Sequence, residues 1–178
     1  MPSPDPHQPP PLPDGIVIRP ARPADVRTVR SLVAPLAESR VLLQKEAVSY
    51  YESVRDYVVA EQDGRLVGCG ALHVMWQDLA EVRTLAVLPE VAGRGLGSAI
   101  LERLVEQARE LGLRRLFCLT FETDFFRRHG FTPIDGQAVS HEVYAELLRS
   151  YDEGVAEFLD LERVKPNTLG NTRMLRVL

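Results

Sequence analysis

Residues 81–112 read EVRTLAVLPEVAGRGLGSAILERLVEQARELG, and the rest of the chain is organised around them. The first part, residues 82–88, is rich in β-forming side chains and predicts a buried strand that Pro89 ends, since proline cannot donate to a ladder. The last part carries apolar residues at helical spacing and predicts an amphipathic helix that ends at Gly112. A glycine-rich turn, GRGLGS at residues 93–98, joins the strand to the helix.

This turn predicts an anion site. The first turn of a helix has N–H groups without intrahelical partners and carries the positive end of the dipole. Glycines let the backbone approach a bound group closely, so phosphate or pyrophosphate is the expected guest. The predicted phosphate-binding residues are Gly93, Arg94, Gly95, Leu96, Gly97 and Ser98.

Two nucleotide-binding patterns do not fit the turn. A dinucleotide fingerprint requires a third glycine where Ser98 stands, and the acidic residue expected about 20 positions later is missing, with Arg114 and Arg115 near that place. A Walker P-loop requires a lysine that the turn lacks. One purely structural alternative stays open, in which the glycines only allow the helix to pack close to the strand.

The turn resembles the coenzyme A loop of the GNAT superfamily of N-acetyltransferases, whose pattern is [QR]-x-x-G-x-[GA]. Residues 94–97 match its core, while Ala92 stands where the pattern has Gln or Arg. The resemblance implies acetyl-CoA as co-substrate and an α/β GNAT fold, a mixed central sheet of about six to seven strands flanked by helices. A homodimer is a common assembly in that superfamily.

Length and composition predict one domain at residues 15–178, preceded by a disordered proline-rich tail at residues 1–14. The net charge of −4 argues against nucleic acid or an anionic membrane as a partner. No apolar run approaches the ~18 residues of a membrane span. Cys69 and Cys118 lie in apolar, strand-like runs, so we expect reduced thiols and a cytoplasmic protein.

The remaining elements follow the order expected of a GNAT domain. A first strand at residues 16–19 precedes a helix that we expect Pro35 to interrupt, and a second helix follows. An Asp63-Gly64 turn joins strands at residues 57–61 and 66–74, where strand glycines indicate a bulge or a close ligand. After the central helix we expect a strand at 113–119, a short helix before Gly130, a helix capped by Ser140, and another at 151–160. The chain then runs through a loop at 165–172 to a last strand at 173–178.

Several segments narrow the resemblance to N-acetylglutamate synthase, and in particular to its short single-domain bacterial form. They are LLQK at 42–45, VGCGAL at 67–72, Glu81, and the stretches at 150–160 and 165–171. The resemblance implies an amino-acid N-acetyltransferase that acetylates the α-amine of L-glutamate or L-glutamine. In the family this reaction is the first step of arginine biosynthesis.

The resemblance also assigns catalytic roles. The backbone amides of Leu85, Ala86 and Val87 are expected to pair with pantetheine and to support the oxyanion. Glu81 is the expected general base, and Glu122, just past the fifth strand, competes with it. Phe126 occupies the position of the tyrosine that commonly protonates the thiolate in the superfamily, which leaves that role without a residue.

Lys45, Cys69 and Arg83 form the expected substrate-binding set, with the two cations holding carboxylates of the acceptor. An arginine stands at the place of Lys45 in the longer synthases, so the match is one of charge. Those synthases place another cation near Glu122, so a negative charge there makes glutamine a credible acceptor. Neither cysteine has a sequence cue for activation, which favours direct acetyl transfer.

Two other functions remain open at this stage. One is GNAT chemistry on a protein N-terminus or a polyamine, although a polyamine would need an acidic pocket. The other is a catalytically silent acyl-CoA sensor, supported by Ala92 and Phe126. His73, His129 and His141 show no metal-ligand spacing, so no metal is expected.

Overall fold

A computed structural model of the chain describes residue 12 and residues 14–164 and 170–178. The proline-rich tail predicted at residues 1–14 therefore lies outside the described residues, apart from Leu12 and Asp14. Residues 165–169 of the predicted final loop also lie outside them.

A seven-stranded mixed sheet forms the centre of the fold and confirms the predicted class. Its strands, in spatial order, are β1 (Ile16–Pro20), β2 (Tyr57–Gln62), β3 (Arg65–Trp76), β4 (Leu79–Val87), β5 (Arg115–Thr120), β7 (Thr172–Val177) and β6 (Thr132–Pro133). The two-residue strand β6 was not predicted, because its ladder depends on β7, about 40 residues later in the sequence.

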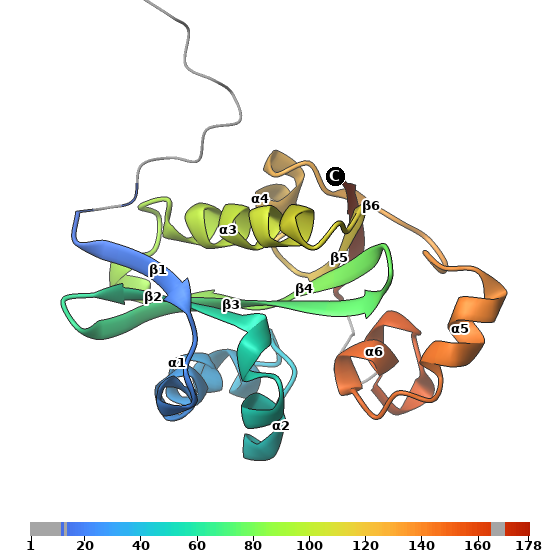
Figure 1. Cartoon of the computed structure of the whole chain (residues 1–178), viewed down its shortest axis with the longest axis horizontal. Coiled ribbons are helices and arrows are strands. Elements are labelled where there is room, and N and C mark those ends of the chain that lie inside the picture. The colour runs from blue at the N-terminus through green and yellow to red at the C-terminus, as the bar shows by residue number, and fades with distance from the viewer. Residues whose placement is uncertain (1–11, 13, 165–169) are drawn as a thin grey trace, which may run out of the picture.

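Helices cover both faces of this sheet (Figure 1). One face carries α3 (Leu96–Glu110) and α4 (Thr123–Arg128), and the other carries α1 (Val26–Glu38) and α2 (Ala47–Glu52). Near β5 lie α5 (His141–Leu147) and α6 (Glu153–Phe158). Short 3₁₀ turns occupy Pro23–Asp25, Val54–Asp56, Pro89–Val91 and Glu162–Val164.

Strands β4 and β5 are parallel but pair only at their beginnings. Their register covers Leu79 with Arg115, Ala80 with Leu116, and Glu81 with Phe117, and then stops. Beyond Glu81 the two strands separate, so β4 has unpaired backbone groups on the side that faces β5. Such groups need partners from a ligand or water.

A β-bulge bends β4 just after this point. Cys69 of β3 pairs with Ala86 and Ala71 pairs with Arg83, so Thr84 and Leu85 together oppose the single residue Gly70. Thr84 has a φ of +53°, a rare conformation for a β-branched residue. A bulge increases the local twist of its strand, which fits the divergence of β4 from β5.

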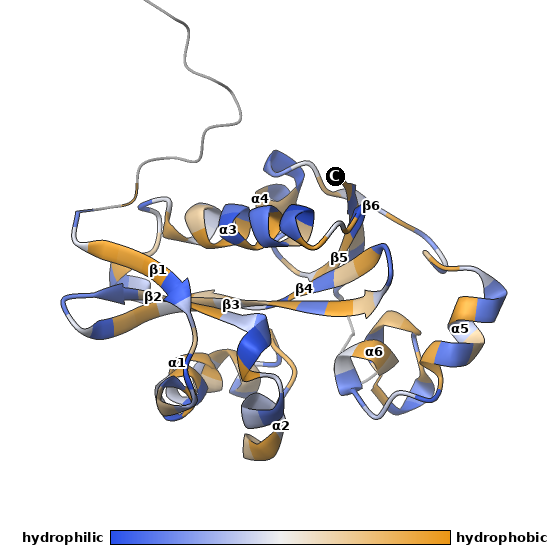
Figure 2. Ribbon diagram, viewed as in Figure 1, coloured by the Kyte–Doolittle hydropathy of each residue, from blue (hydrophilic) through white to orange (hydrophobic). Residues whose placement is uncertain are grey.

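Three apolar clusters hold the layers together, and the orange face of α3 in Figure 2 turns toward the sheet. The largest lies between α3 and the sheet and contains the fully buried Ile100 and Leu104. A second packs α1 and α2 on the other face. The third joins α6 to β5, where the Phe117 and Phe158 rings meet edge to face at a centroid distance of 4.9 Å.

Two expectations need correction. Helix α1 continues through Pro35 to Glu38, because the bond that proline cannot donate lies in the last turn and Ser39 still donates to the Pro35 carbonyl. For the strand glycines, the bulge is present opposite Gly70, but the close approach at Gly68 and Gly70 comes from α3 and not from a ligand site. A Cβ added to Gly68 would lie 2.9 Å from Ile100 Cδ1, and one added to Gly70 would lie 2.8 Å from Ile100 Cγ2.

The close packing of α3 on Gly68 can be tested by stability. We expect Gly68→Ala to lower the free energy of unfolding by about 1–3 kcal/mol through overpacking. Ile100→Val removes the obstructing Cδ1 and costs about 0.5–1.5 kcal/mol alone. Urea denaturation should show the double variant to be more stable than the two separate losses predict. Additive losses would contradict the contact.

Candidate active site

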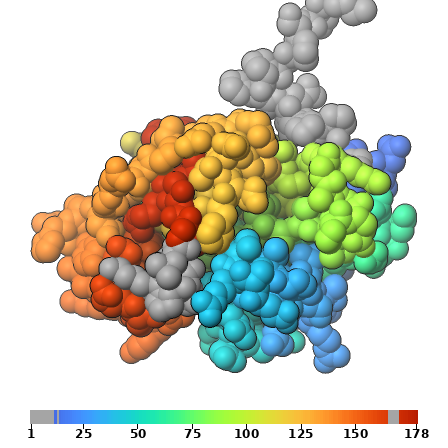
Figure 3. All heavy atoms as spheres, turned by 180° about the vertical axis from the view of Figure 1, so that it is seen from behind, coloured from blue at the N-terminus to red at the C-terminus, as the bar shows by residue number. Residues whose placement is uncertain are grey.

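A cavity of about 660 Å³ occupies the space that opens between β4 and β5. Its walls come from β4 residues 81–87, the end of β5, the glycine turn before α3, α4, α6 and the segment before α2. In the rear view of Figure 3, the segment before α2 (cyan), the start of α3 (lime) and α4 (yellow-orange) border the same region of the surface. The cavity is therefore lined by residues from elements that are spread over most of the chain.

The glycine turn forms one end of the cavity. Gly93 and Gly95 have φ values of +76° and +83°, conformations that favour glycine, and both line the cavity with Gly97 and Ser98. The Arg94 side chain is exposed and does not line the cavity, while the Leu96 side chain is buried in the core. Those two residues can therefore serve the site only through their backbone amides.

Ser98 belongs to a short polar chain at this end. Its hydroxyl lies 3.0 Å from His129 Nε2, and His129 Nδ1 lies 3.0 Å from a Glu102 carboxylate oxygen. Ser98 and Glu102 are one turn apart on α3, so the imidazole spans them both. The contact orients the Ser98 side chain at the glycine turn and gives His129 two polar partners.

The β4 backbone forms the middle of the cavity. Leu85, Ala86 and Val87 all line it. Leu88 donates its N–H to the Val67 carbonyl of β3 at 2.8 Å. Because successive amides of a strand point to opposite sides, the N–H of Val87 points away from β3, into the gap.

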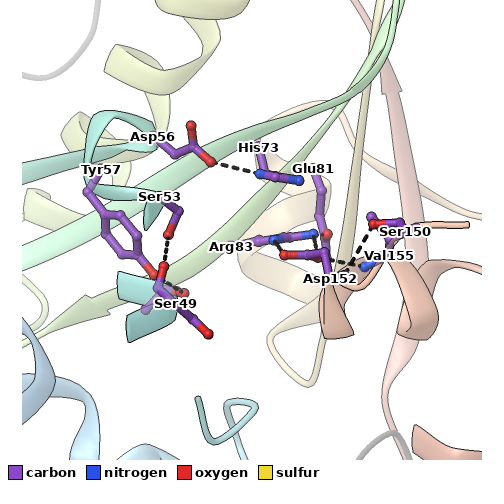
Figure 4. A network of polar contacts seen from close by, with 11 residues as sticks. Ser49, Ser53, Asp56, Tyr57, His73, Glu81, Arg83, Ser150, Asp152 and Val155 are labelled. Carbon is purple, nitrogen blue, oxygen red and sulfur yellow. Dashed lines mark hydrogen bonds and ion pairs between the residues drawn. The ribbon is translucent and has the colours of Figure 1, made fainter. Parts of the chain in front are cut away.

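Arg83 dominates the other end (Figure 4). Its Nε donates to Glu81 at 2.6 Å, and its two Nη atoms donate to the Asp152 carboxylate at 3.0 and 2.6 Å. Asp152 also caps α6 by accepting the Val155 N–H at 2.9 Å. The fork that we expected to hold a substrate carboxylate therefore already holds a carboxylate of the protein.

Gly154 packs directly on this guanidinium. A Cβ there would lie 2.5 Å from the Arg83 Cζ, so no larger residue fits without moving Arg83. Burial, the largest single influence, would raise the pKa of Asp152, but the hydrogen bond with Arg83, the Arg83 charge and the Val155 N–H together outweigh burial and lower that pKa to about 2. Burial opposes the charge on Arg83 too, yet Glu81 and Asp152 raise its pKa, so the guanidinium stays charged.

Lys45 lines the cavity near this cluster. Among the residues that the structure describes, it makes no hydrogen bond or ion pair through its ammonium. Burial lowers its pKa, as does the nearby positive charge of Arg83, while the carboxylates of Glu81, Asp152 and Glu157 act in the opposite direction. Lys45 is thus a cation still available to an anionic ligand.

Glu157 is the functional candidate that sequence reasoning missed. It lies on α6, is only 9% exposed and lines the cavity. Burial, followed by the negative charge of Glu81, raises its pKa to about 7. Its neighbours Val155, Ala156 and Phe158 are all buried, and a carboxylate within such a stretch was the signal available in the sequence.

The two carboxylates chosen from the sequence differ in setting. Glu81 is 4% exposed, lines the cavity and is paired with Arg83. Glu122 is exposed at the end of β5, where it lines the cavity and precedes α4. Phe126, in the place of the superfamily's tyrosine, is buried against Phe131 with a ring-centroid distance of 5.2 Å.

The structure corrects the expectation for Cys69. This side chain is fully buried between the sheet and α1, and its Sγ donates to the Thr84 carbonyl at 3.4 Å. It does not line the cavity, so it cannot contact a substrate there. Burial raises the pKa of Cys69 to about 12 and also raises that of Cys118, so neither thiol is activated.

Within the described ranges, no group of three or more His, Cys, Asp or Glu side chains is arranged to hold a metal ion. Among the same residues, none of the helices has both the length and the apolar character to cross a membrane.

Comparison with known proteins gives consistent results. The model of the acetyltransferase (GNAT) family matches residues 29–131. An amino-acid acetyltransferase of Mycobacterium tuberculosis is 56% identical over 91% of this chain and 94% of its own length. A longer amino-acid acetyltransferase of Pseudomonas putida is 34% identical over 66% of this chain but only 28% of its own length.

Solved structures agree with this picture. Rv2747 from Mycobacterium tuberculosis, in complex with CoA and NLQ, is 56% identical and superposes with a TM-score of 0.88 over 91% of this chain and 99% of its own. N-acetylglutamate synthase from Neisseria gonorrhoeae, complexed with coenzyme A and N-acetyl-glutamate, is 25% identical. Its TM-score is 0.73 over 92% of this chain and 35% of its own.

The Arg83–Asp152 pair can be tested by pH-dependent stability. Asp152→Asn should keep the α6 cap but lose the charge, at a cost of about 1.5–3 kcal/mol above pH 4. Because the folded-state pKa of Asp152 is depressed to about 2 from 3.8, the difference from wild type should vanish as the pH falls toward 2. Glu90→Gln, at the exposed pair with Arg65, is the control and should stay close to wild type at every pH. Equal losses in both variants would contradict a special role for the Asp152 pair.

Proposed function

Since the chain belongs to the acetyltransferase (GNAT) family, we propose that it transfers the acetyl group of acetyl-CoA to the α-amine of a free amino acid, glutamine or glutamate. One observation carries this proposal: a single cavity joins the glycine turn at one end to the ammonium of Lys45, which is unpaired among the described residues, at the other. An anionic coenzyme and an amino acid with an α-carboxylate suit these two ends.

The coenzyme end fits a pyrophosphate. Gly93 and Gly95 turn the chain into α3, whose first amides lack intrahelical partners. A Cβ on Gly97 would meet only the Phe125 ring at 3.7 Å, so a ligand can lie directly against this backbone. The Val87 amide, in the open gap, is the partner that we assign to the pantetheine arm, together with the backbone of Leu85, whereas the Ala86 amide faces β3 and is left out.

The reaction follows from this arrangement. The acceptor amine attacks the thioester carbonyl carbon, and an N–H group of β4 supports the oxygen as it becomes negative. The C–S bond then breaks and CoA leaves. The raised thiol pKa values of Cys69 and Cys118 support direct transfer without an acetylated cysteine.

At the end of the cavity near Arg83, which we call the acceptor end, Lys45 and Arg83 have different roles in our proposal, although the sequence assigned a substrate carboxylate to both. We assign the substrate's carboxylate first to Lys45, which has no partner among the described residues. Arg83 uses three of its five N–H groups on Glu81 and Asp152, so it offers the substrate only what remains. In this proposal Arg83 mainly stabilises its cluster with Glu81 and Asp152.

Charge balance favours glutamine over glutamate. The cavity is lined by the cations Lys45, Arg83 and Arg128 and by the carboxylates of Glu81, Glu122 and Glu157, and Asp152 adds a fourth carboxylate through its pair with Arg83. A second carboxylate on the substrate would add to this excess of negative charge, whereas a side-chain amide needs only hydrogen bonds. The names of the relatives support an amino-acid acceptor, and on the family resemblance we place the reaction at the first step of arginine biosynthesis. A single domain at residues 15–178, a cytoplasmic location and a homodimer remain predictions.

The experiment that tests this function measures thiol release from acetyl-CoA with a panel of amino acids. We expect steady turnover with glutamine and glutamate, and a higher kcat/KM for glutamine. Absence of thiol release with every amino acid, together with tight acetyl-CoA binding, would instead favour the sensor function.

The coenzyme end can be tested at Gly97. Gly97→Glu should weaken acetyl-CoA binding at least about tenfold, because it puts a carboxylate where the pyrophosphate lies. Isothermal titration calorimetry measures the affinity, and circular dichroism confirms the fold. Gly97→Ala adds only a Cβ in ordinary contact with Phe125 and should lose less. Wild-type affinity in Gly97→Glu would refute the assignment.

The acceptor end can be tested at Lys45. Lys45→Ala should reduce kcat/KM for the amino acid by about 10- to 150-fold, the value of a hydrogen bond to a charged group, and spare KM for acetyl-CoA. Lys45→Arg should restore part of the loss because it keeps the charge. Arg27→Ala, an exposed cation on α1, is the control and should behave as wild type. Unchanged kinetics in Lys45→Ala would remove Lys45 from the site.

A further inference from the structure

We infer that Glu157 is the general base of the proposed acetyl transfer: its carboxylate, buried at the cavity wall and free of partners among the described residues, takes the proton of the acceptor's ammonium group. The inference rests on the proposed function and names the residue that does the proton chemistry. It differs from the expectation drawn from the sequence, which chose Glu81 or Glu122.

The pairing of the three carboxylates distinguishes them. Glu81 receives the Arg83 Nε hydrogen bond at 2.6 Å, and protonating it would leave a buried guanidinium without one of its two counter-charges. Glu122 is exposed, so water solvates its carboxylate and competes with the substrate amine for hydrogen bonds to it. Glu157 is 9% exposed, lines the cavity, and makes no hydrogen bond or ion pair through its side chain in the part of the chain that the structure describes.

The fold holds Glu157 in place through both ends of α6. At the beginning, Asp152 caps the helix and is fixed by Arg83, and Gly154 lies flat against the same guanidinium. At the end, Arg173 of β7 donates to the backbone carbonyls of Glu157 at 3.2 Å and Phe158 at 2.7 Å. Gly154 and Glu157 are three residues apart, so the carboxylate shares the helix face that meets β4.

The surrounding charges suit a base. Burial raises the pKa of Glu157 to about 7, and the charges of Glu81 and Glu153 raise it while those of Arg83 and Lys45 lower it. A further cation, Arg173, contacts the backbone of Glu157. A base with a pKa near neutrality is ionised often enough to accept a proton and basic enough to keep it during attack.

The amino acid enters as an ammonium ion, and Glu157 takes one proton to give the neutral amine. The amine forms the N–C bond, the C–S bond breaks, and a second amine proton reaches the departing sulfur. The products are the N-acetylated amino acid, CoA as the thiol, and one proton that Glu157 releases to water.

The experiment compares Glu157→Gln with Glu153→Gln across pH 6–10. Glu153 is the matched control, because it lies on the same helix but is exposed and pairs with Arg163. We expect Glu157→Gln to lower kcat by about 10²- to 10⁴-fold near pH 7, to lose the acidic limb of the profile near pH 7, and to recover as the amine deprotonates unaided. KM for acetyl-CoA should stay unchanged, and Glu153→Gln should keep the wild-type kcat and the acidic limb, displaced only slightly to lower pH because one distant negative charge is removed.

A stability measurement separates a catalytic from a structural role. The folded-state pKa of Glu157 is raised to about 7 from 4.5, so the wild type loses stability as the pH rises through this window. Glu157→Gln removes that loss and should have a higher Tm than wild type at pH 8, with the difference closing toward pH 4.5. A lower Tm with weaker acetyl-CoA binding would mean a structural role and overturn the inference.

The outcomes also separate this inference from the proposed function. If the wild type releases no thiol with any amino acid, the proposed function fails. If the wild type is active but Glu157→Gln keeps kcat within about threefold and retains the acidic limb, the proposed function stands and Glu157 is not the base. In that case Glu81→Gln and Glu122→Gln are compared in the same assay.

Discussion

The acceptor half of the molecule, the part around Arg83, Lys45 and α6, depends on the contacts of the buried Arg83 guanidinium. It ties β4 to α6 through Asp152, neutralises Glu81, and provides the flat surface on which Gly154 rests. Removing one partner of a buried charge is strongly unfavourable, so the loss of either carboxylate would destabilise the whole cluster around Arg83. Lys45 and Glu157 take no part in these contacts and stay unpaired among the described residues, as the proposed binding cation and base require.

The coenzyme half depends on a different constraint, the separation of two parallel strands. Pairing of β4 with β5 ends at Glu81, and the bulge at Thr84 twists the remainder of β4 away. The separation leaves backbone amides of β4 unpaired, and in an ordinary sheet such amides could pair with another chain. Here the amides line a cavity, so an extended ligand can make the hydrogen bonds that a neighbouring strand would otherwise make.

Local patterns predicted much of this architecture, and long-range geometry accounts for what they missed. The strand–turn–helix at residues 81–112, the Asp63-Gly64 hairpin and the Ser140 cap depend on neighbouring residues, and all three are present. The partner of Arg83 could not be predicted, because Asp152 lies 69 residues away in the sequence. Cys69 was misassigned because alternation along a strand does not reveal which face meets a cavity and which meets a helix. Glu157 was overlooked because a glutamate in a short helix is usually solvated.

The position of β7 in the sheet affects the order in which the protein is assembled during synthesis. This strand comes late in the chain, yet it lies between β5 and β6. While the chain emerges from the ribosome, β1 to β4 and α3 can associate first, whereas β6 has no partner until β7 arrives. Arg173, which holds the end of α6, is also on β7. The coenzyme half can therefore form early, and the acceptor half becomes complete only when this late strand is inserted.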